Sequence, residues 1–377
     1  MNPPLVALDI GSTKVACAIG LPRERSAGFE LLGASVVPYP LLAESWLSDP
    51  LLVSRTIEQA LEATAVTGDF HRALVAINPP LSTSERIRAS ITLADEPMTV
   101  RTHDLERLQR SALDQALGID REPLLVERLS CSGNGFEGVR DPRGLAATRL
   151  LGTFHIVTMP MAARRAATQA VESAGLEVAS LSHPLPAVLA GVGDEELFRK
   201  RVVVIDASGL TTEVGCFVEG VLTALEIAPV GGVRLAMAVA KRLQVTVEQA
   251  TAWSLEGTSC RKPEVRKLVE AHWSLVQAAM ERILADQLRP DQVLVTGRGA
   301  LIDGFVEWVE RAGGMSASLA RGERTPKAAD LTRQVGLSAA IGLLEAATRG
   351  QAGAAARPAR LFNRLVHHTR TILTEYF

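Results

Sequence analysis

Two stretches of the chain, roughly two hundred residues apart, repeat the same order of apolar and polar positions. The first has an apolar run at residues 5–10, a polar turn, and a second apolar run at 15–19. The other has a run at 201–206, a turn of small and polar residues, and a run at 214–218. Short apolar runs bounded by turn residues are typical of buried strands. The repeat therefore predicts two related lobes, each with a strand–turn–strand hairpin.

The rest of the pattern predicts the elements that surround these hairpins. An α+β insertion covers residues 81–155, with a strand at 87–93 and a helix at 102–117 whose Asp104 and Glu106 lie in the first turn. Other buried strands are predicted at 73–78 and 292–296. A helix follows Gly231 and Gly232, and further helices are predicted at 51–67, 162–174, 186–193, 247–255, 262–288 and 333–347.

Composition and charge place the chain among ordinary globular proteins. Hydrophobic residues make up 47% of its 377 residues and charged residues 22%, which excludes the disordered and collagen-like classes. With 40 Lys and Arg against 42 Asp and Glu, the chain lacks the broad positive field of a nucleic-acid binder. No run of about 20 apolar residues and no secretory signal is present, so we expect a cytoplasmic protein. The cysteines lack the spacing of a zinc site or a short disulfide framework, and they are Cys17, Cys131, Cys216 and Cys260.

Both hairpin turns carry residue types that bind phosphate. In the first, Asp9 precedes Gly11, Ser12, Thr13 and Lys14. Backbone N–H groups and hydroxyls of such a turn can surround phosphate oxygens, and an Asp at the strand end can hold Mg²⁺ through water. One such turn alone also fits an ordinary hairpin. The second turn and a third glycine turn favour a nucleotide clamp, and their residues are Asp206, Gly209, Thr211, Thr212, Glu213, Gly297, Arg298 and Gly299.

These motifs carry a resemblance to a known superfamily. The sequences at 9–14, 206–213 and 295–300 resemble the phosphate-1, phosphate-2 and adenosine motifs of actin, sugar kinases and heat-shock chaperones. Within that superfamily, Phe-Glu-Gly-Val-Arg-Asp-Pro-Arg-Gly-Leu at 136–145 and Pro-Val-Gly-Gly at 229–232 are similar to the FtsA family of bacterial cell-division proteins. The resemblance implies an actin-like two-lobed α/β ATPase fold with duplicated ribonuclease-H-like subdomains and an inserted subdomain called 1C.

The resemblance also implies a division of the chain and a set of ligands. ATP and Mg²⁺ would bind between the lobes, with Asp9 and Asp206 as the catalytic, metal-side residues, and Gly231, Gly232 and Glu248 would join the turn residues in cofactor binding. Lobe 1 (1A) would comprise 1–80 and 156–200, the 1C-like insertion 81–155, and lobe 2 (2A) 201–235 and 290–348. The remaining parts would be a shortened, mostly helical 2B-like subdomain at 236–289, a flexible linker at 349–358 and an amphipathic helix at 359–377.

Several positions depart from the family pattern. The second turn keeps one glycine, and Leu210 is expected to hinder close approach of its backbone to phosphate. Thr251 and Ala252 replace residues that would reach the ribose and base, and Arg298 replaces a glycine. We therefore expect weakened nucleotide binding and at most slow ATP hydrolysis. The short segment 236–289 leaves open whether it accepts the C-terminal peptide of the tubulin-like protein FtsZ or is only a helical cap on the lobe.

The last residues form an amphipathic helix on a helical wheel. Its apolar half includes Leu361, Phe362, Leu365, Ile372, Leu373 and Phe377, and basic residues that flank or face away from it include Arg360, Arg364 and Arg370. A basic face opposite apolar side chains is typical of a helix lying in an anionic membrane surface. A helix docked on its own domain or on a partner is the alternative.

Together these features predict a membrane-tethered actin-like cell-division protein on the cytoplasmic face of the membrane. It would bind ATP, assemble with itself into filaments, contact FtsZ and other cell-division proteins, and not bind nucleic acid. A pilus-assembly platform protein of the PilM type is the alternative within the superfamily. A small-molecule kinase is a further one, but no carboxylate base for it stands out. His183 could orient a water molecule, or it could be a hydrogen-bonded structural residue.

Overall fold

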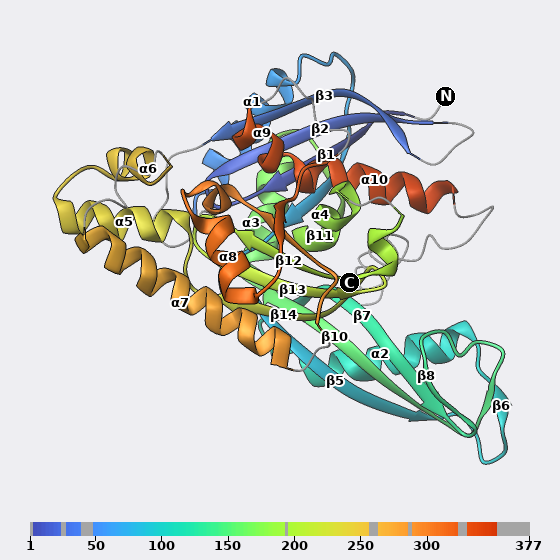
Figure 1. Cartoon of the computed structure of the whole chain (residues 1–377). Coiled ribbons are helices and arrows are strands. Elements are labelled where there is room, and N and C mark those ends of the chain that lie inside the picture. Colours follow the sequence, from blue (N-terminus) through green and yellow to red (C-terminus); the bar gives the residue numbers. More distant parts are fainter. Residues whose placement is uncertain are drawn as a thin grey trace.

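The computed structural model describes residues 3–23, 28–38, 48–192, 195–255, 263–285, 289–322 and 330–352. Its first sheet has the strand order β11-β4-β1-β2-β3 (Figure 1). β1 pairs antiparallel with β2 and parallel with β4, so the predicted first hairpin forms the middle of the sheet. The strands are β1 (Leu5–Ile10), β2 (Lys14–Pro22), β3 (Phe29–Pro38), β4 (Arg72–Ile77) and β11 (Glu177–Ser182).

A second sheet repeats this topology with the strand order β14-β13-β12-β15-β16. β12 pairs antiparallel with β13 and parallel with β15, as β1 does with β2 and β4. The predicted duplication of the hairpin is therefore confirmed and extends to the whole sheet. The strands are β12 (Arg201–Ala207), β13 (Thr212–Val218), β14 (Val221–Ala228), β15 (Gln292–Thr296) and β16 (Ala317–Leu319).

Helices cover the two sheets. α10 (Ser338–Ala352) contacts β1, β2 and β4, and it packs closely on α4 (Pro184–Val192). A Cβ at Gly342 would lie 1.7 Å from the carbonyl oxygen of Ala187, so only glycine permits this helix approach. α1 (Pro50–Ala63) packs beside α3 (Met161–Ser173) on the first sheet. On the second sheet, the long helix α7 (Pro263–Ala285) contacts β13 and β14.

Shorter helices complete the second lobe. α5 (Gly232–Leu243) contacts α6 (Val247–Leu255) and α7, while α8 (Phe305–Gly313) contacts β16. Between residues 232 and 285, the part of the chain that the structure describes is helical apart from short connections, as the sequence predicts. The aromatic side chains of Trp273, Phe305 and Trp308 pack together with ring centroids 5.2–5.7 Å apart, so these tryptophans are packing residues.

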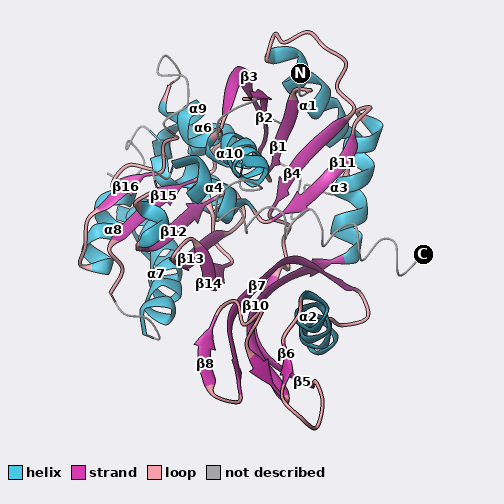
Figure 2. Cartoon of the chain, turned by 90° about the vertical axis from the view of Figure 1, so that its right-hand side faces the viewer, coloured by secondary structure: helices cyan, strands magenta, loops and turns pink. Residues whose placement is uncertain are grey.

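An inserted module follows β4 and has its own four-stranded sheet, in the order β5-β10-β7-β8. α2 (Thr102–Ala116) lies along one face of that sheet (Figure 2) and closes a separate core that includes Leu108, Leu150 and Phe154. The module projects from the rest of the molecule at the lower right of Figure 1. Its strands are β5 (Thr83–Thr92), β6 (Met98–Thr99), β7 (Arg121–Gly133), β8 (Phe136–Val139), β9 (Ala146–Ala147) and β10 (Arg149–Pro160).

Three predictions about helix ends need correction. The single helix predicted at 333–347 is two helices, α9 (Leu331–Gly336) and α10, which are separated at Leu337. The helix predicted at 51–67 ends at Ala63, because Ala65 takes a positive φ of 57° that a helix cannot continue. The linker predicted at 349–358 overlaps α10, which extends to Ala352.

The rest of the predicted linker and the amphipathic segment at 359–377 lie outside the described residues. No helix in the described ranges is long and apolar enough to cross a membrane.

Candidate functional site

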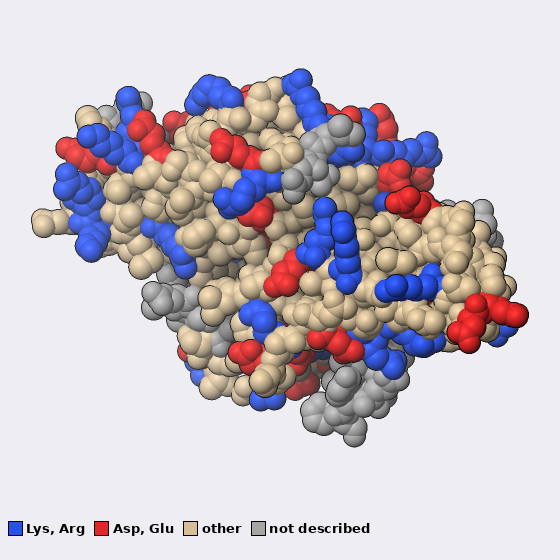
Figure 3. Space-filling model, turned by 90° about the horizontal axis from the view of Figure 1, so that it is seen from below, with Lys and Arg blue, Asp and Glu red and all other residues tan. Residues whose placement is uncertain are grey.

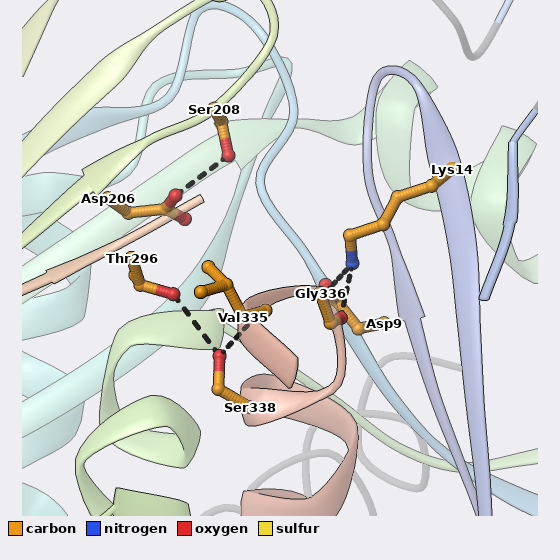
Figure 4. Close-up of polar contacts among 8 residues, drawn as sticks. All are labelled: Asp9, Lys14, Asp206, Ser208, Thr296, Val335, Gly336 and Ser338. Carbon is orange, nitrogen blue, oxygen red and sulfur yellow. Dashed lines mark hydrogen bonds and ion pairs between the residues drawn. The ribbon is translucent and has the colours of Figure 1, made fainter. Parts of the chain in front are cut away.

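The first glycine turn connects β1 to β2 and is closed by a hydrogen bond from the Gly11 N–H to the Lys14 carbonyl oxygen, 3.0 Å long. Lys14 Nζ lies 2.5 Å from Asp9 Oδ2 and donates to the Gly336 carbonyl oxygen at 2.9 Å (Figure 4). The ammonium group is partly buried, with its side chain 21% exposed. Lys14 therefore joins the first turn to the end of α9, which follows it by more than three hundred residues.

The second glycine turn connects β12 to β13 and has the same form. The Ser208 N–H donates to the Thr211 carbonyl oxygen at 3.0 Å, and Ser208 Oγ donates to Asp206 Oδ1 at 2.9 Å. Leu210 is buried and packs in the large hydrophobic cluster beside Leu185 and Phe217. The Leu210 side chain thus anchors the turn in the core, and Gly209 is the residue that faces the other turn.

The amino end of α5 holds the second turn in place. The N–H groups of Gly232 and Val233 donate to the carbonyl oxygens of Ser208 and Gly209, each at 2.9 Å. A Cβ at Gly231 would lie 2.5 Å from the Gly209 carbonyl oxygen, which explains why glycine stands there.

The third glycine turn follows β15 and packs against the strand that carries Asp206. Gly297 has a φ of +82°, and a Cβ on it would fall 2.4 Å from both the Ala207 carbonyl oxygen and Asp206 Oδ1. A Cβ on Gly299 would come within 2.7 Å of the same carbonyl oxygen. These glycines allow the turn, which continues into the short helix η4 (Arg298–Leu301), to lie directly beside the second turn.

The two hairpin turns meet each other. A Cβ on Gly209 would lie 2.5 Å from Ser12 Oγ and 2.7 Å from Thr13 Cγ2, so the hydroxyl residues of the first turn contact the glycine of the second. The structure thus brings together residues that the sequence separates by roughly two hundred positions. All three glycine turns converge at one place between the two sheets.

The carboxyl group of Asp206 is the most perturbed acid of the site. Burial, together with the nearby carboxylates of Glu213 and Asp9, raises its pKa to about 7, while Ser208 and Lys14 oppose the shift. A buried carboxyl group without a full positive partner favours a cation beside it. Carboxylates of Asp9 and Asp206 therefore fit Mg²⁺ chemistry, although no group of three or more His, Cys, Asp and Glu in the described residues forms a metal cluster by itself.

Behind Asp206, Glu213 and His183 form a fully buried pair. Asp206 and Glu213 are directly opposite on β12 and β13, and His183 Nε2 lies 3.2 Å from both carboxylate oxygens of Glu213. The Leu185 N–H donates to His183 Nδ1 at 3.4 Å, which leaves Nε2–H to donate to Glu213. His183 is thus a hydrogen-bonded structural residue, and Oε2 of Glu213 has no hydrogen-bond partner.

The other predicted cofactor-binding residues either belong to the second hairpin or are exposed. Thr211 is partly buried in the second turn, whereas Thr212 is buried and donates its hydroxyl hydrogen to the Val230 carbonyl oxygen at 2.9 Å. Arg298 and Glu248 are exposed, and no contact between them is seen. Backbone and Thr246 hydrogen bonds lower the pKa of Glu248. The predicted membrane residues lie outside the described ranges.

The sequence analysis missed two polar residues that border the site. Thr296 Oγ1 lies 3.2 Å from Ser338 Oγ, which donates to the Val335 carbonyl oxygen at 2.8 Å (Figure 4). Thr296 is beside Asp206 in the register of β12 and β15. Thr296 stands at the end of a buried strand, as Asp9 and Asp206 do, and this position in the sequence indicates a residue at the site. Ser338 lies in a stretch that the sequence predicted as one continuous helix, so the sequence did not indicate that it borders the site.

Comparison with known proteins adds a sequence relationship. Residues 82–158 match the family described as an SHS2 domain inserted in FTSA. The chain is 24% identical over 370 residues to the cell division protein FtsA of Pseudomonas aeruginosa, an alignment that covers 90% of this chain and 88% of that protein. The chain is therefore similar to FtsA over most of its length. It also matches the Bacillus subtilis FtsA with 23% identity over 254 residues, which is 66% of this chain and 57% of that protein.

The fold of the chain agrees with that of a solved structure. A chain of the PilM-PilN type IV pilus biogenesis complex superposes with a TM-score of 0.67 at 14% identity, covering 90% of this chain and 97% of that one. The predicted actin-like fold with an inserted α+β subdomain is confirmed by this likeness and by the SHS2 match. Both curated proteins named above are cell division proteins.

Proposed function

We propose that the chain binds ATP with Mg²⁺ where the three glycine turns converge. The observation that carries this proposal is the contact between the two hairpin turns, in which Gly209 faces Ser12 and Thr13 from the other sheet. Each turn would offer backbone N–H groups and hydroxyls to phosphate oxygens. Asp9 and Asp206 would lie on the metal side, and the bound cation would supply the positive charge that the buried Asp206 lacks.

Lys14 has a particular part in this proposal. In the structure its ammonium group neutralises Asp9 and is held by the Gly336 carbonyl oxygen. A lysine on a flexible stem can turn from a carboxylate to a phosphate oxygen over a short distance. Lys14 would then leave Asp9 free for the metal side, and its contact with Gly336 would report nucleotide binding to α9.

Calorimetry tests the site directly. Titration of Mg²⁺–ATP should give heat with the wild type and much less with Lys14→Ala or with the double variant Asp9→Ala and Lys14→Ala. Asp303→Asn changes an exposed carboxyl group outside the site and should bind as the wild type does. Equal heats from the wild type and the double variant would contradict the assignment.

We further infer that hydrolysis is slow. Three carboxyl groups in the described residues of the two hairpins are each bound to another group: Asp9 to Lys14, Asp206 to Ser208, and Glu213 to His183. None of the three is placed as a free general base, so turnover should fall below the ~1–10³ s⁻¹ of typical enzymes. Rapid ATP consumption that a sugar or an acid stimulates would instead support the small-molecule kinase.

In the cell, the chain would act as an actin-like cell-division protein that assembles into filaments and anchors the FtsZ ring to the cytoplasmic membrane. The relationship to FtsA supports this role. Residues 359–377 would provide the membrane contact by burying Phe362 and Leu365 while Arg364 and Arg370 face anionic headgroups. Deleting these residues should abolish flotation with anionic liposomes and leave ATP binding intact. Equal flotation of both proteins would favour a helix docked on protein.

Filament formation is measured separately. The wild type should sediment and form filaments on anionic lipid monolayers with ATP, visible by electron microscopy, because actin-like lobes associate head to tail. Protein that stays monomeric at high coverage would refute self-assembly. An FtsZ tail peptide should bind if segment 236–289 retains that contact, and fluorescence anisotropy measures it.

A second candidate is a platform protein for pilus assembly. The superposition on the PilM-PilN complex favours it, because 97% of that chain is covered. The two roles predict different cellular positions. A fluorescent fusion at the division site would support the cell-division role, and a fusion at pilus assembly sites that leaves division unaffected when deleted would support the pilus role.

A further inference from the structure

The inserted module ends on one side in an open strand edge. β5 is the first strand of the order β5-β10-β7-β8, and among the described residues its other side has no partner strand. Its pairing with β10 runs over ten residue pairs, from Thr83 to Thr92, without a bulge. Long, regular edge strands are templates for the addition of another strand, and bulges or prolines normally interrupt them. Neither interrupts β5.

The backbone direction of β5 follows from the end of its ladder. The Leu93 N–H donates to the Thr148 carbonyl oxygen at 2.8 Å and continues the β5–β10 register by one pair. In an antiparallel pair, residues that bond to the partner alternate with residues whose N–H and C=O point away. The backbone groups of Arg88, Ser90 and Thr92 therefore point to the open side.

Only the outer half of this edge is accessible. At the inner half, β14 contacts β5, and Arg86 Nη2 donates to the Thr223 carbonyl oxygen at 3.3 Å. Among the described residues, no side-chain hydrogen bond joins residues 88–92 to β14. Residues 88–92 thus form the accessible part, long enough for three outward-pointing backbone positions.

The side chains of this accessible part are basic and hydroxylic. Arg88 and Thr92 are exposed, and Arg149, which is opposite Thr92 on β10, is exposed and donates to Ser90 Oγ at 2.9 Å. Leu151, opposite Ser90, is 46% exposed on the same sheet face, away from α2. Residues 88–92 and 149–153 contain no Asp or Glu, so no carboxylate of these segments neutralises the two arginines. The charged side chains of these two segments are therefore all basic.

From below, the surface shows basic and acidic side chains in separate small groups instead of one broad field of one sign (Figure 3). A charge-based contact on this face must therefore be local and short. Recognition of a large polyanion such as nucleic acid needs an extended positive surface, which this arrangement does not offer.

We propose that residues 88–92 of β5 bind an acidic, extended peptide, which adds to the module as a fifth strand. The peptide backbone pairs with the outward groups of Arg88, Ser90 and Thr92, as in other cases of strand addition. Its alternate side chains lie on the face of Arg88 and Arg149, so Asp or Glu at every second position forms favourable cross-strand pairs. An apolar side chain in the same row packs on Leu151.

A second copy of the chain fits this edge poorly. When two β5 edges pair with each other, they place Arg88 and Arg149 of both copies on one face, and like charges across strands are unfavourable. The arginines thus select against self-pairing and in favour of an acidic strand. The open edge lies in the module and not at the glycine turns, so it includes none of the residues proposed to hold ATP.

A labelled peptide that alternates Glu and Val tests the proposal, with a peptide of Lys and Val as the charge control. Fluorescence anisotropy with the full chain should show binding of the Glu peptide only, and the affinity should fall as salt is raised. Arg88→Glu should weaken it about tenfold or more, because an attractive pair becomes a repulsive one. Arg266→Glu, the same change on the exposed face of α7, should leave it unchanged.

A second variant tests the backbone part of the proposal. Ser90→Pro removes one outward N–H without touching the ladder to β10, and proline is tolerated at such edge positions. It should abolish binding while the melting temperature stays close to that of the wild type. Hydrogen exchange should show slower exchange at the Arg88 and Thr92 amides with the Glu peptide. Equal binding of the Lys peptide, or unchanged binding in both variants, would overturn the proposal.

Discussion

Replacing Asp206 with Asn should make the nucleotide-free protein more stable and weaken its binding of Mg²⁺–ATP. Burial raises the pKa of this carboxyl group from 3.8 to about 7, with Glu213 and Asp9 adding to the shift. In the unfolded chain the group loses its proton near pH 4. Between pH 4 and 7 the folded state therefore holds more protons, and folding stability decreases as pH rises through this window. Asn carries no charge, so the folding stability of the variant does not decrease with pH through this residue.

The magnitude follows from the pKa difference. A shift of about three units corresponds to about 4 kcal/mol at pH 8, where the wild-type carboxyl group is ionised in both states. At pH 5 the gain should be only about 1–2 kcal/mol, and at pH 3 it should vanish. The amide oxygen of Asn can still accept the hydrogen bond from Ser208 Oγ, so the local geometry is kept.

Urea unfolding at pH 8, 5 and 3 measures the effect. Asp206→Asn should raise the midpoint most at pH 8 without changing the slope, and calorimetry on the same sample should show reduced Mg²⁺–ATP binding. Asp303→Asn is the matched control, because the same chemical change at an exposed carboxyl should stay within about 0.5 kcal/mol at every pH. An Asp206→Asn protein that is no more stable at pH 8 than at pH 3, relative to wild type, would refute the reasoning.

Two further predictions concern the third turn and the module. Gly297→Ala should destabilise the protein by about 2–4 kcal/mol in thermal unfolding, because it combines a φ of +82° with a clash at the Ala207 carbonyl oxygen. The control is Gly135→Ala, where φ is +80° but the space is open, and it should cost only about 1 kcal/mol. The contact of the module with β14 should weaken as pH falls from 6.5 toward 4, because burial lowers the pKa of His155 to about 4 and the open state binds the proton more readily. Hydrogen exchange of the Leu222 region at pH 7 and 5 measures this, and equal protection at both would contradict it.

The sequence predicted the parts of the site that are local in the chain. The runs at 5–10 and 292–296 coincide with β1 and β15, because a continuous apolar run bounded by turn residues has few other solutions. The turn residues of both hairpins also lie where the spacing placed them. The two hairpin turns meet because the hairpin is duplicated: two related lobes face each other with equivalent edges of their sheets.

The remaining features depend on contacts between distant segments. Nothing near Lys14 in the sequence indicates that it reaches the Gly336 carbonyl oxygen, and nothing near Leu210 indicates that it packs beside Leu185. The break between α9 and α10 was missed, although Gly336 ends α9, because the apolar period runs through Leu337 and no proline follows it. Tertiary packing decides such positions, and a single sequence does not contain it.

The base of the module touches both lobes, which limits how the lobes can move. On the lobe 1 side, Arg121 joins the two segments by which the chain enters and leaves the module. It donates to the Leu81 carbonyl oxygen at 2.9 Å and to Thr158 Oγ1 at 2.7 Å. On the lobe 2 side, His155 Nδ1 donates to the Leu222 carbonyl oxygen at 3.0 Å, and Ser84 is 2.8 Å from its Nε2.

A rotation of the second sheet relative to the first must therefore either break the His155 contact or turn the module about Arg121. A buried imidazole left without its carbonyl partner is costly, so turning the module is the favoured response. Any ligand that changes the angle between the glycine turns should then also change the direction in which the open edge of β5 faces. The two proposed sites are separate in chemistry, but they are coupled through the contacts of the module with β14, which include the hydrogen bonds of His155 and Arg86.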